Sequence, residues 1–109
     1  MEVAENYVRL MEGIPKRLHF IEHKWVKKRI KDPETGWEKD VNALIFRVDW
    51  EDGLKVDKSF SVISTKLQQM FLPYLADNLY KRYIFTIIKH GAGYVTEFEL
   101  RTEPWVLGT

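Results

Sequence analysis

The alternation of hydrophobic and polar positions is most regular in two stretches near the end of the chain. Residues 80–89 are apolar on both faces, which indicates a strand inside a sheet rather than at its edge. Residues 94–101 alternate between apolar and polar positions, which is typical of a strand with one buried face. Because Gly91 and Gly93 lie between these stretches, the two strands are predicted to form a hairpin.

The same alternation of apolar and polar positions predicts three earlier strands. Residues 16–31 form a long strand with a bulge, because the apolar positions change face midway. Residues 40–50 and 54–62 each alternate, and the Asp-Gly sequence in residues 51–53 predicts a tight turn between them. Residues 32–37 contain Pro and Gly in positions that suit a turn. These strands are therefore predicted to form a meander.

Two segments show helical spacing instead. Residues 2–14 have apolar side chains on one helical face, and Gly13 and Pro15 are expected to end this helix. It would serve as a lid over one end of the sheet or as a dimer contact. A second helix is predicted to begin after Ser64 or Thr65 as the N-cap and to break near Pro73. Its apolar stripe is interpreted as part of the core.

Length and composition limit the class of protein. The chain has 109 residues, which suits one compact domain, with an N-terminal helix over residues 1–15 and the remaining domain over residues 16–109. No apolar run approaches the roughly 20 residues that cross a bilayer, and no secretory signal is recognisable, so we expect a soluble cytoplasmic protein without membrane partners. The absence of cysteine excludes disulfides and thiol chemistry.

Charge is distributed unevenly although the net charge is only +1. Residues 16–31 carry seven basic side chains and one acid, Glu22, and residues 58–96 carry five basic side chains and one acid, Asp77. If the two basic blocks lie together in space, they form a strip that attracts a polyanion. The alternative is a solvated surface balanced by neighbouring acids.

Catalytic patterns are weak, and we do not expect an enzyme or a cofactor. His19 and His23 lie on one predicted strand without a carboxylate on the same face, so the sequence does not favour a metal site there. No serine lies in a nucleophile elbow, and Gly91-Ala92-Gly93 lacks the further glycine and helix of a nucleotide-binding loop.

The order of helix, three strands, helix and two strands resembles the OB-fold over residues 16–101. Lys89 precedes the Gly91-x-Gly93 loop, and a Thr96-x-Phe98 pair follows it, which looks like the closing part of small phage and archaeal OB-type proteins that bind single-stranded DNA. This resemblance implies a mainly β protein, a five-stranded OB-like Greek-key barrel with a helix between strands three and four and a short N-terminal helix. In such barrels, oligonucleotides bind across strands two and three and the adjoining loops.

The predicted function is therefore binding of single-stranded nucleic acid without sequence specificity, DNA in preference to RNA, by aromatic stacking and neutralisation of the backbone. Trp25 either stacks on bases or belongs to the core, and Trp37 either stays at its loop tip or folds back onto the sheet. The predicted binding residues are Trp25, Lys27, Arg29, Trp37, Arg47, Tyr83, Lys89 and Tyr94. The alternative function is a protein-interaction module, either as a homodimer or with a replication or repair protein.

Overall fold

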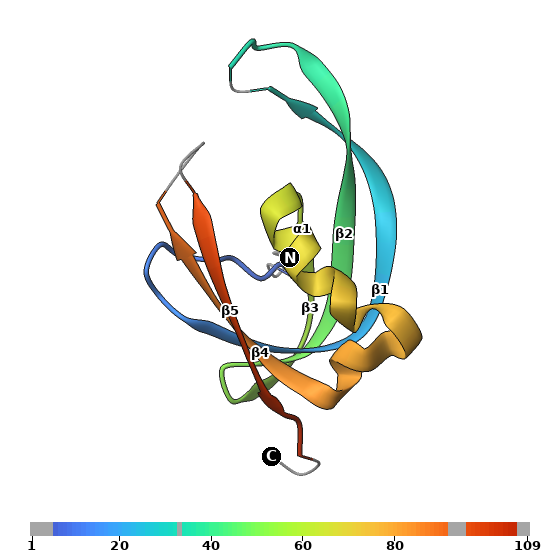
Figure 1. Cartoon of the computed structure of the whole chain (residues 1–109), viewed down its shortest axis with the longest axis vertical. Helices are drawn as coiled ribbons and strands as arrows, with labels where there is room; N and C mark the ends of the chain where they lie inside the picture. Colours follow the sequence, from blue (N-terminus) through green and yellow to red (C-terminus); the bar gives the residue numbers. More distant parts are fainter. Residues whose placement is uncertain (1–5, 33, 92–95, 107–109) are drawn as a thin grey trace, which may run out of the picture.

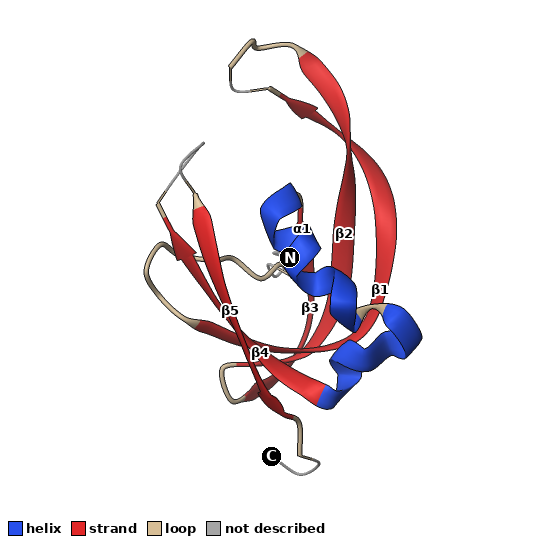
Figure 2. Cartoon of the chain, in the orientation of Figure 1, coloured by secondary structure: helices blue, strands red, loops and turns tan. Residues whose placement is uncertain are grey.

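The computed structural model describes residues 6–32, 34–91 and 96–106 of the chain. Five strands form one antiparallel sheet in the order β3-β2-β1-β4-β5, which curves around a single core (Figures 1 and 2). The strands are β1 (Lys16–Lys31), β2 (Glu38–Glu51), β3 (Leu54–Val62), β4 (Tyr83–His90) and β5 (Glu97–Pro104). The prediction of a mainly β fold is confirmed, and β3 and β5 are the outermost strands of the sheet.

The predicted bulge lies in the first half of β1. The pairing of β1 with β2 shifts register between His19 and Glu22, and the three consecutive residues Leu18, His19 and Phe20 are all buried. A regular strand would send His19 to the opposite face from its neighbours, so the irregularity allows β1 to bend. Before the bulge β1 pairs with both β2 and β4, and after it only with β2.

The core consists mainly of aromatic rings from the concave side of the sheet. Phe20 stacks on Phe46 with ring centroids 4.1 Å apart, and Phe71 and Phe85 pack against the same ring. One face of β2 lines this core, because Leu44, Phe46 and Val48 are buried in it. The predicted alternation over residues 40–50 thus corresponds to a strand with one face toward the core.

A helix between β3 and β4 covers this core, as predicted. It comprises α1 (Thr65–Phe71), followed by the 3-10 turns η1 (Leu72–Tyr74) and η2 (Ala76–Arg82) (Figure 2). Ser64 is the N-cap, and its hydroxyl accepts a hydrogen bond from the backbone N–H of Leu67. The α-helix ends before Pro73, which lacks the N–H needed to continue it.

The prediction of an N-terminal helix is wrong for residues 6–14, which contain two isolated β-bridges and a turn but no helix. The backbone N–H of Ser59 donates to the carbonyl of Asn6 (2.7 Å), and the N–H of Val8 donates to the carbonyl of Ser59 (2.9 Å). Farther along, the N–H of Gly13 donates to the carbonyl of Lys89 (2.8 Å). The segment forms hydrogen bonds with backbone groups of β3 and β4. The helical spacing of its apolar side chains could not reveal these bonds, because they involve only the backbone.

Strand β4 begins later than predicted, at Tyr83 instead of Tyr80. Tyr80 is in η2, where its ring is fully buried and its hydroxyl lies 2.8 Å from Nδ1 of His23. Asp77 and Asn78 have φ near +53° and form the kink that turns Tyr80 into the core. Packing therefore overrides the strand preference of residues 80–82.

Candidate nucleic-acid interface

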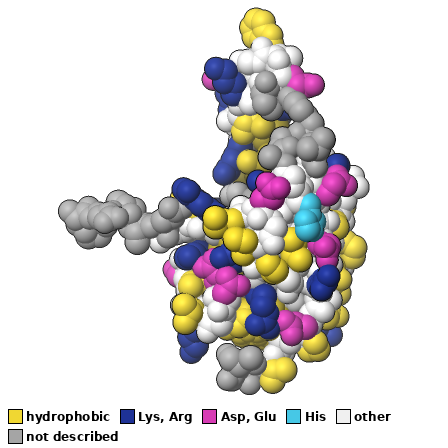
Figure 3. All heavy atoms as spheres, turned by 90° about the vertical axis from the view of Figure 1, so that its left-hand side faces the viewer, with side chains coloured by type: hydrophobic (Ala, Val, Ile, Leu, Met, Phe, Trp, Pro, Cys, Tyr) yellow, Lys and Arg dark blue, Asp and Glu magenta, His cyan; other side chains and the backbone are white. Residues whose placement is uncertain are grey.

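The β1–β2 hairpin extends beyond the rest of the sheet. Val62, the last residue of β3, pairs with Leu44, so the hairpin has no third strand beyond that position. We call residues 24–45 the arm; only its last two residues, Leu44 and Ile45, pair with β3, and the remainder projects beyond it (Figure 1). Figure 3 shows hydrophobic side chains at its end, with basic and acidic side chains next to them. A two-stranded ribbon of this kind exposes both of its faces.

Strand register assigns the arm's side chains to two faces. Trp25 pairs with Leu44, and His23 just before the arm pairs with Phe46, so these residues share the face that continues into the core. We call it the inner face. Its β1 residues are Trp25, Lys27, Arg29 and Lys31. The outer face carries the intervening residues of β1, which are Lys24, Val26, Lys28 and Ile30.

Trp25 is on the surface, not in the core. Its exposed fraction is 46%, although its neighbour across the strands, Leu44, is completely buried. The ring therefore lies where the inner face passes from the core to the arm. An exposed indole there offers a stacking surface for a base, flanked by the exposed cations Lys27 and Arg29.

Four of the arm's five lysines differ from its arginine in their partners, the exception being Lys39, which is paired with Asp32. Lys24, Lys27, Lys28 and Lys31 form no ion pair or side-chain hydrogen bond with any part of the chain that the structure describes. Arg29, by contrast, lies 3.2 Å from Asp40 and 3.8 Å from Glu38 on the inner face. These four lysines are therefore available to bind phosphate groups. At Arg29, a phosphate group would have to compete with the two carboxylates.

Trp37 lies at the end of the arm with 76% of its surface exposed, so it does not fold back onto the sheet. The turn that carries it is held by several hydrogen bonds. The N–H of Asp32 donates to the carbonyl of Trp37 (2.8 Å), and the N–H of Gly36 donates to the carbonyl of Asp32 (2.8 Å). Gly36 has φ of +75°, a conformation that glycine adopts readily. The exposed indole thus lies next to a turn whose ends are joined by backbone hydrogen bonds.

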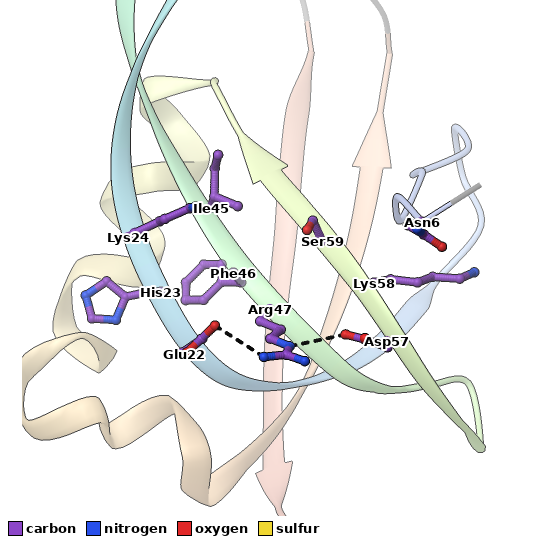
Figure 4. Close-up of a pocket in the computed structure, with 10 residues that line it drawn as sticks. All are labelled: Asn6, Glu22, His23, Lys24, Ile45, Phe46, Arg47, Asp57, Lys58 and Ser59. Atoms are coloured by element: carbon purple, nitrogen blue, oxygen red, sulfur yellow. Dashed lines mark hydrogen bonds and ion pairs between the residues drawn. The ribbon is translucent and has the colours of Figure 1, made fainter. Parts of the chain in front are cut away.

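Arg47 lies on the opposite side of the sheet from Trp25. Its guanidinium is 3.1 Å from Asp57 and 3.7 Å from Glu22, and Figure 4 shows these ion pairs crossing three strands. Hydrogen bonding and charge attraction from Asp57 raise the pKa of Arg47, with a smaller effect from Glu22. The adjoining hollow of about 390 Å³ also contains Lys24 and Lys58. Arg47 is therefore already neutralised by acids.

The remaining predicted residues do not join the arm. Tyr83 is half-buried, with its ring 5.6 Å from Tyr74 in an edge-to-face contact, so it packs on the core. Lys89 is half-buried beside Leu10 and Phe98 in a separate groove. Tyr94 lies outside the described residues. Sequence reasoning also omitted Lys24, Lys28 and Lys31, which the strict alternation after the bulge could have assigned to the two faces.

The histidines have structural partners. His19 is buried, with Nδ1 2.7 Å from Asp49 and Nε2 2.8 Å from the carbonyl of Lys81, and its ring stacks on Trp105. His90 lies 3.1 Å from Glu99, a contact that lowers the pKa of this carboxyl together with Arg101. Within the described residues, no three His, Asp or Glu side chains are grouped so as to hold a metal ion.

Helices long and apolar enough to cross a bilayer do not occur in the described part of the chain. The chain was also compared with models of protein families, with curated proteins and with solved structures, and none of the three comparisons found a significant match.

Proposed function

We propose that this protein binds single-stranded nucleic acid, DNA in preference to RNA, along the inner face of the arm. Trp25 stacks on a base, Lys27 and Lys31 contact phosphates, and Arg29 joins them when a phosphate displaces its carboxylate partners. Trp37 supplies a further exposed ring at the end of the arm. Arg47 and Tyr83 are not included in this site, since their side chains are engaged elsewhere, and Lys89 is not included because it lies in a separate groove.

One observation carries the proposal, namely an exposed tryptophan next to unpaired lysines on the same strand face. Trp25 is nearly half exposed, and Lys27 and Lys31 lie two and six residues after it, on the same face of β1. Stacking is tolerant of base identity because every base has a π-face, and lysine contacts with phosphate carry no sequence information. Binding without sequence specificity is therefore what this arrangement supports.

We also infer that the fold is of the OB type. Three meandering strands are followed by a helix and a two-stranded hairpin, with β1 in contact with both β2 and β4. In OB barrels the loop between strands one and two borders the binding surface, and the arm corresponds to an elongated form of this loop. This placement agrees with a binding site on the arm but does not depend on it.

A second candidate function rests on a different surface. Tyr7, Met11 and Ile14 project from the N-terminal segment with exposed fractions of 52–63%, beside a hollow bordered by Lys16 and Lys58. Exposed apolar side chains grouped in this way are typical of protein contact sites. This surface supports the alternative of a protein-interaction module, including a homodimer. Light scattering that shows a stable dimer, without oligonucleotide binding, would favour it.

The test is a titration with oligo-dT at several salt concentrations, in which tryptophan emission is the measured signal. We expect quenching, and a decrease in affinity as salt increases. Trp25→Ala should weaken binding by about 1–3 kcal/mol. Lys27→Ala should reduce the slope of log affinity against log salt by roughly 0.7, the contribution of one phosphate of a single strand.

Lys55→Ala is the matched control, because Lys55 is also exposed and makes no ion pair among the described residues but lies at the start of β3, outside the arm. Its salt slope should equal that of the unmodified protein. Absence of quenching and of any affinity at low salt would rule out the proposed function.

A further inference from the structure

We propose that the preferred ligand is a junction between single-stranded and duplex nucleic acid, with the arm inserted between the two separating strands. This inference rests on the proposed function and specifies its substrate. The inner face lies against one strand, the outer face lies against the other, and Trp37 lies against the last base pair of the duplex.

The outer face of the arm is the first observation. Lys24 and Lys28 project from it without partners among the described residues, and register places no acid between them. Their cross-strand neighbours Ile45 and Val41 are apolar. A single strand lying on the inner face could not contact these lysines, because successive residues of a strand point to opposite sides. Their charge therefore indicates a second phosphate backbone.

The balance of charge on the two faces supports this conclusion. The inner face combines Lys27, Arg29 and Lys31 with the acids Glu38 and Asp40, whereas the strand pairs of the outer face from Lys24 to Ile30 contain the cations Lys24, Lys28 and Lys39 and no acid. Glu22, which precedes Lys24 on this face, is paired with Arg47 at 3.7 Å. Lys39 is paired with Asp32 at 3.4 Å, which leaves Lys24 and Lys28 as unpaired charges. If the ligand contacted the inner face only, it would lie next to the acids Glu38 and Asp40, and the unpaired lysines Lys24 and Lys28 would point away from it. A ligand that contacts both faces also uses these two lysines.

The end of the arm provides the third observation. Trp37 is the most exposed tryptophan, and the backbone hydrogen bonds between Asp32 and Trp37 and between Gly36 and Asp32 hold its turn in place. The terminal base pair of a duplex presents a flat apolar surface, to which an indole ring is complementary. A ring at the end of a narrow projecting element can reach that surface while the two separated strands pass on either side. Trp37 at the end of the two-stranded arm has this position.

Two matched double variants test the assignment of faces. Lys24→Ala/Lys28→Ala and Lys27→Ala/Lys31→Ala remove the same charge from the same strand but from opposite faces. Their affinities are measured for three ligands. These are an oligo-dT strand, a duplex that ends in two unpaired oligo-dT tails (the fork), and the blunt duplex. We expect the unmodified protein to bind the fork about tenfold more tightly than oligo-dT.

The outer-face variant should bind oligo-dT normally, while its salt slope on the fork falls by about 1.4, which corresponds to two phosphates of a single strand. The inner-face variant should lose affinity for both ligands. Equal affinity of the unmodified protein for the fork and for oligo-dT would overturn the inference. So would an outer-face variant with an unchanged slope on the fork, or one that weakens oligo-dT binding as much as the inner-face variant does.

Trp37→Ala tests the end of the arm. It should remove the roughly tenfold preference for the fork, and Trp37→Phe should retain most of it because the smaller ring still stacks. A Trp37→Ala protein with the full preference for the fork would overturn the role of this residue. Failure of the unmodified protein to bind either oligo-dT or the fork would instead contradict the proposed function itself.

Discussion

The four tryptophans differ in environment more than their sequence positions suggest. Trp50 is buried at the end of the sheet, and Trp105 stacks on the His19 ring with centroids 3.9 Å apart. Trp25 and Trp37 are exposed on the arm. The residue pattern left burial and exposure equally open for these two, because apolar alternation continues along β1 past the point where the core ends. Only the position of the last residue of β3 resolves the question.

The hydroxyl of Tyr80 provides a pH test of the core. Burial raises the pKa of this phenol above its ordinary value of 10.0, and the negative charge of Glu22 adds to the effect. Because the native pKa is higher than the unfolded one, the group's contribution to stability is complete below pH 10 and is lost as the pH rises toward the native pKa. We therefore expect the free energy of unfolding to decrease above pH 10.

Tyr80→Phe should make this decrease shallower, since phenylalanine does not ionise. At neutral pH the same change should cost about 0.5–1.5 kcal/mol, because the hydroxyl bonds with His23 and Asn78 are lost. Urea unfolding between neutral pH and pH 11 measures both effects. The control is Tyr7→Phe, since Tyr7 is exposed. An equal alkaline decrease in Tyr80→Phe and the unmodified protein would show that another group is responsible.

At the scale of elements, strands were more predictable than the segments joined to them. Period-two patterning depends on which face is buried, and it located β2 and β3 and the bulge in β1. The N-terminal segment was predicted incorrectly, because its apolar spacing fits a helix while its hydrogen bonds go to Ser59 and Lys89, far away in sequence. Backbone pairing with a sheet edge leaves no side-chain signature, so local pattern could not identify it.

This segment should contribute to stability through Val8, whose side chain is 7% exposed and belongs to the core. We expect Val8→Ala to lower the free energy of unfolding by about 2 kcal/mol, through the loss of two buried methyl groups and the cavity that they leave. Met11→Ala, in the same segment but exposed, should change it by less than about 0.5 kcal/mol. Equal small effects of both substitutions in chemical unfolding would show that the segment is not anchored to the core.

At the scale of the whole molecule, the two basic blocks of the sequence do not combine into one strip. β1 and β4 pair only over Lys16–Leu18, whereas the rest of β1 runs beside the acid-rich β2. The cations of the arm therefore have acidic neighbours on the inner face, and the basic residues near β4 lie elsewhere. A count of charges along the chain could suggest a polyanion partner, but only the pairing of strands decides which cations remain available.

The acids of the inner face should consequently limit affinity, which leads to a prediction of tighter binding. Asp40→Asn removes the closer partner of Arg29, at 3.2 Å, and allows the guanidinium to contact a phosphate. One additional phosphate contact should steepen the salt slope for oligo-dT by roughly 0.7 and increase affinity about tenfold at low salt. Stability should fall by no more than about 1 kcal/mol, because the pair is exposed to solvent.

Asp57→Asn is the matched control for this gain. It removes an acid of the same charge from Arg47, whose side chain lies on the opposite side of the sheet from Trp25. Single-strand affinity should then stay within about twofold of that of the unmodified protein, because only the change in net charge acts at that distance. If the two variants bind oligo-dT equally, or if Asp40→Asn leaves the salt slope unchanged, Arg29 does not contact a phosphate. In that case Lys27 and Lys31 alone provide the phosphate contacts of the inner face.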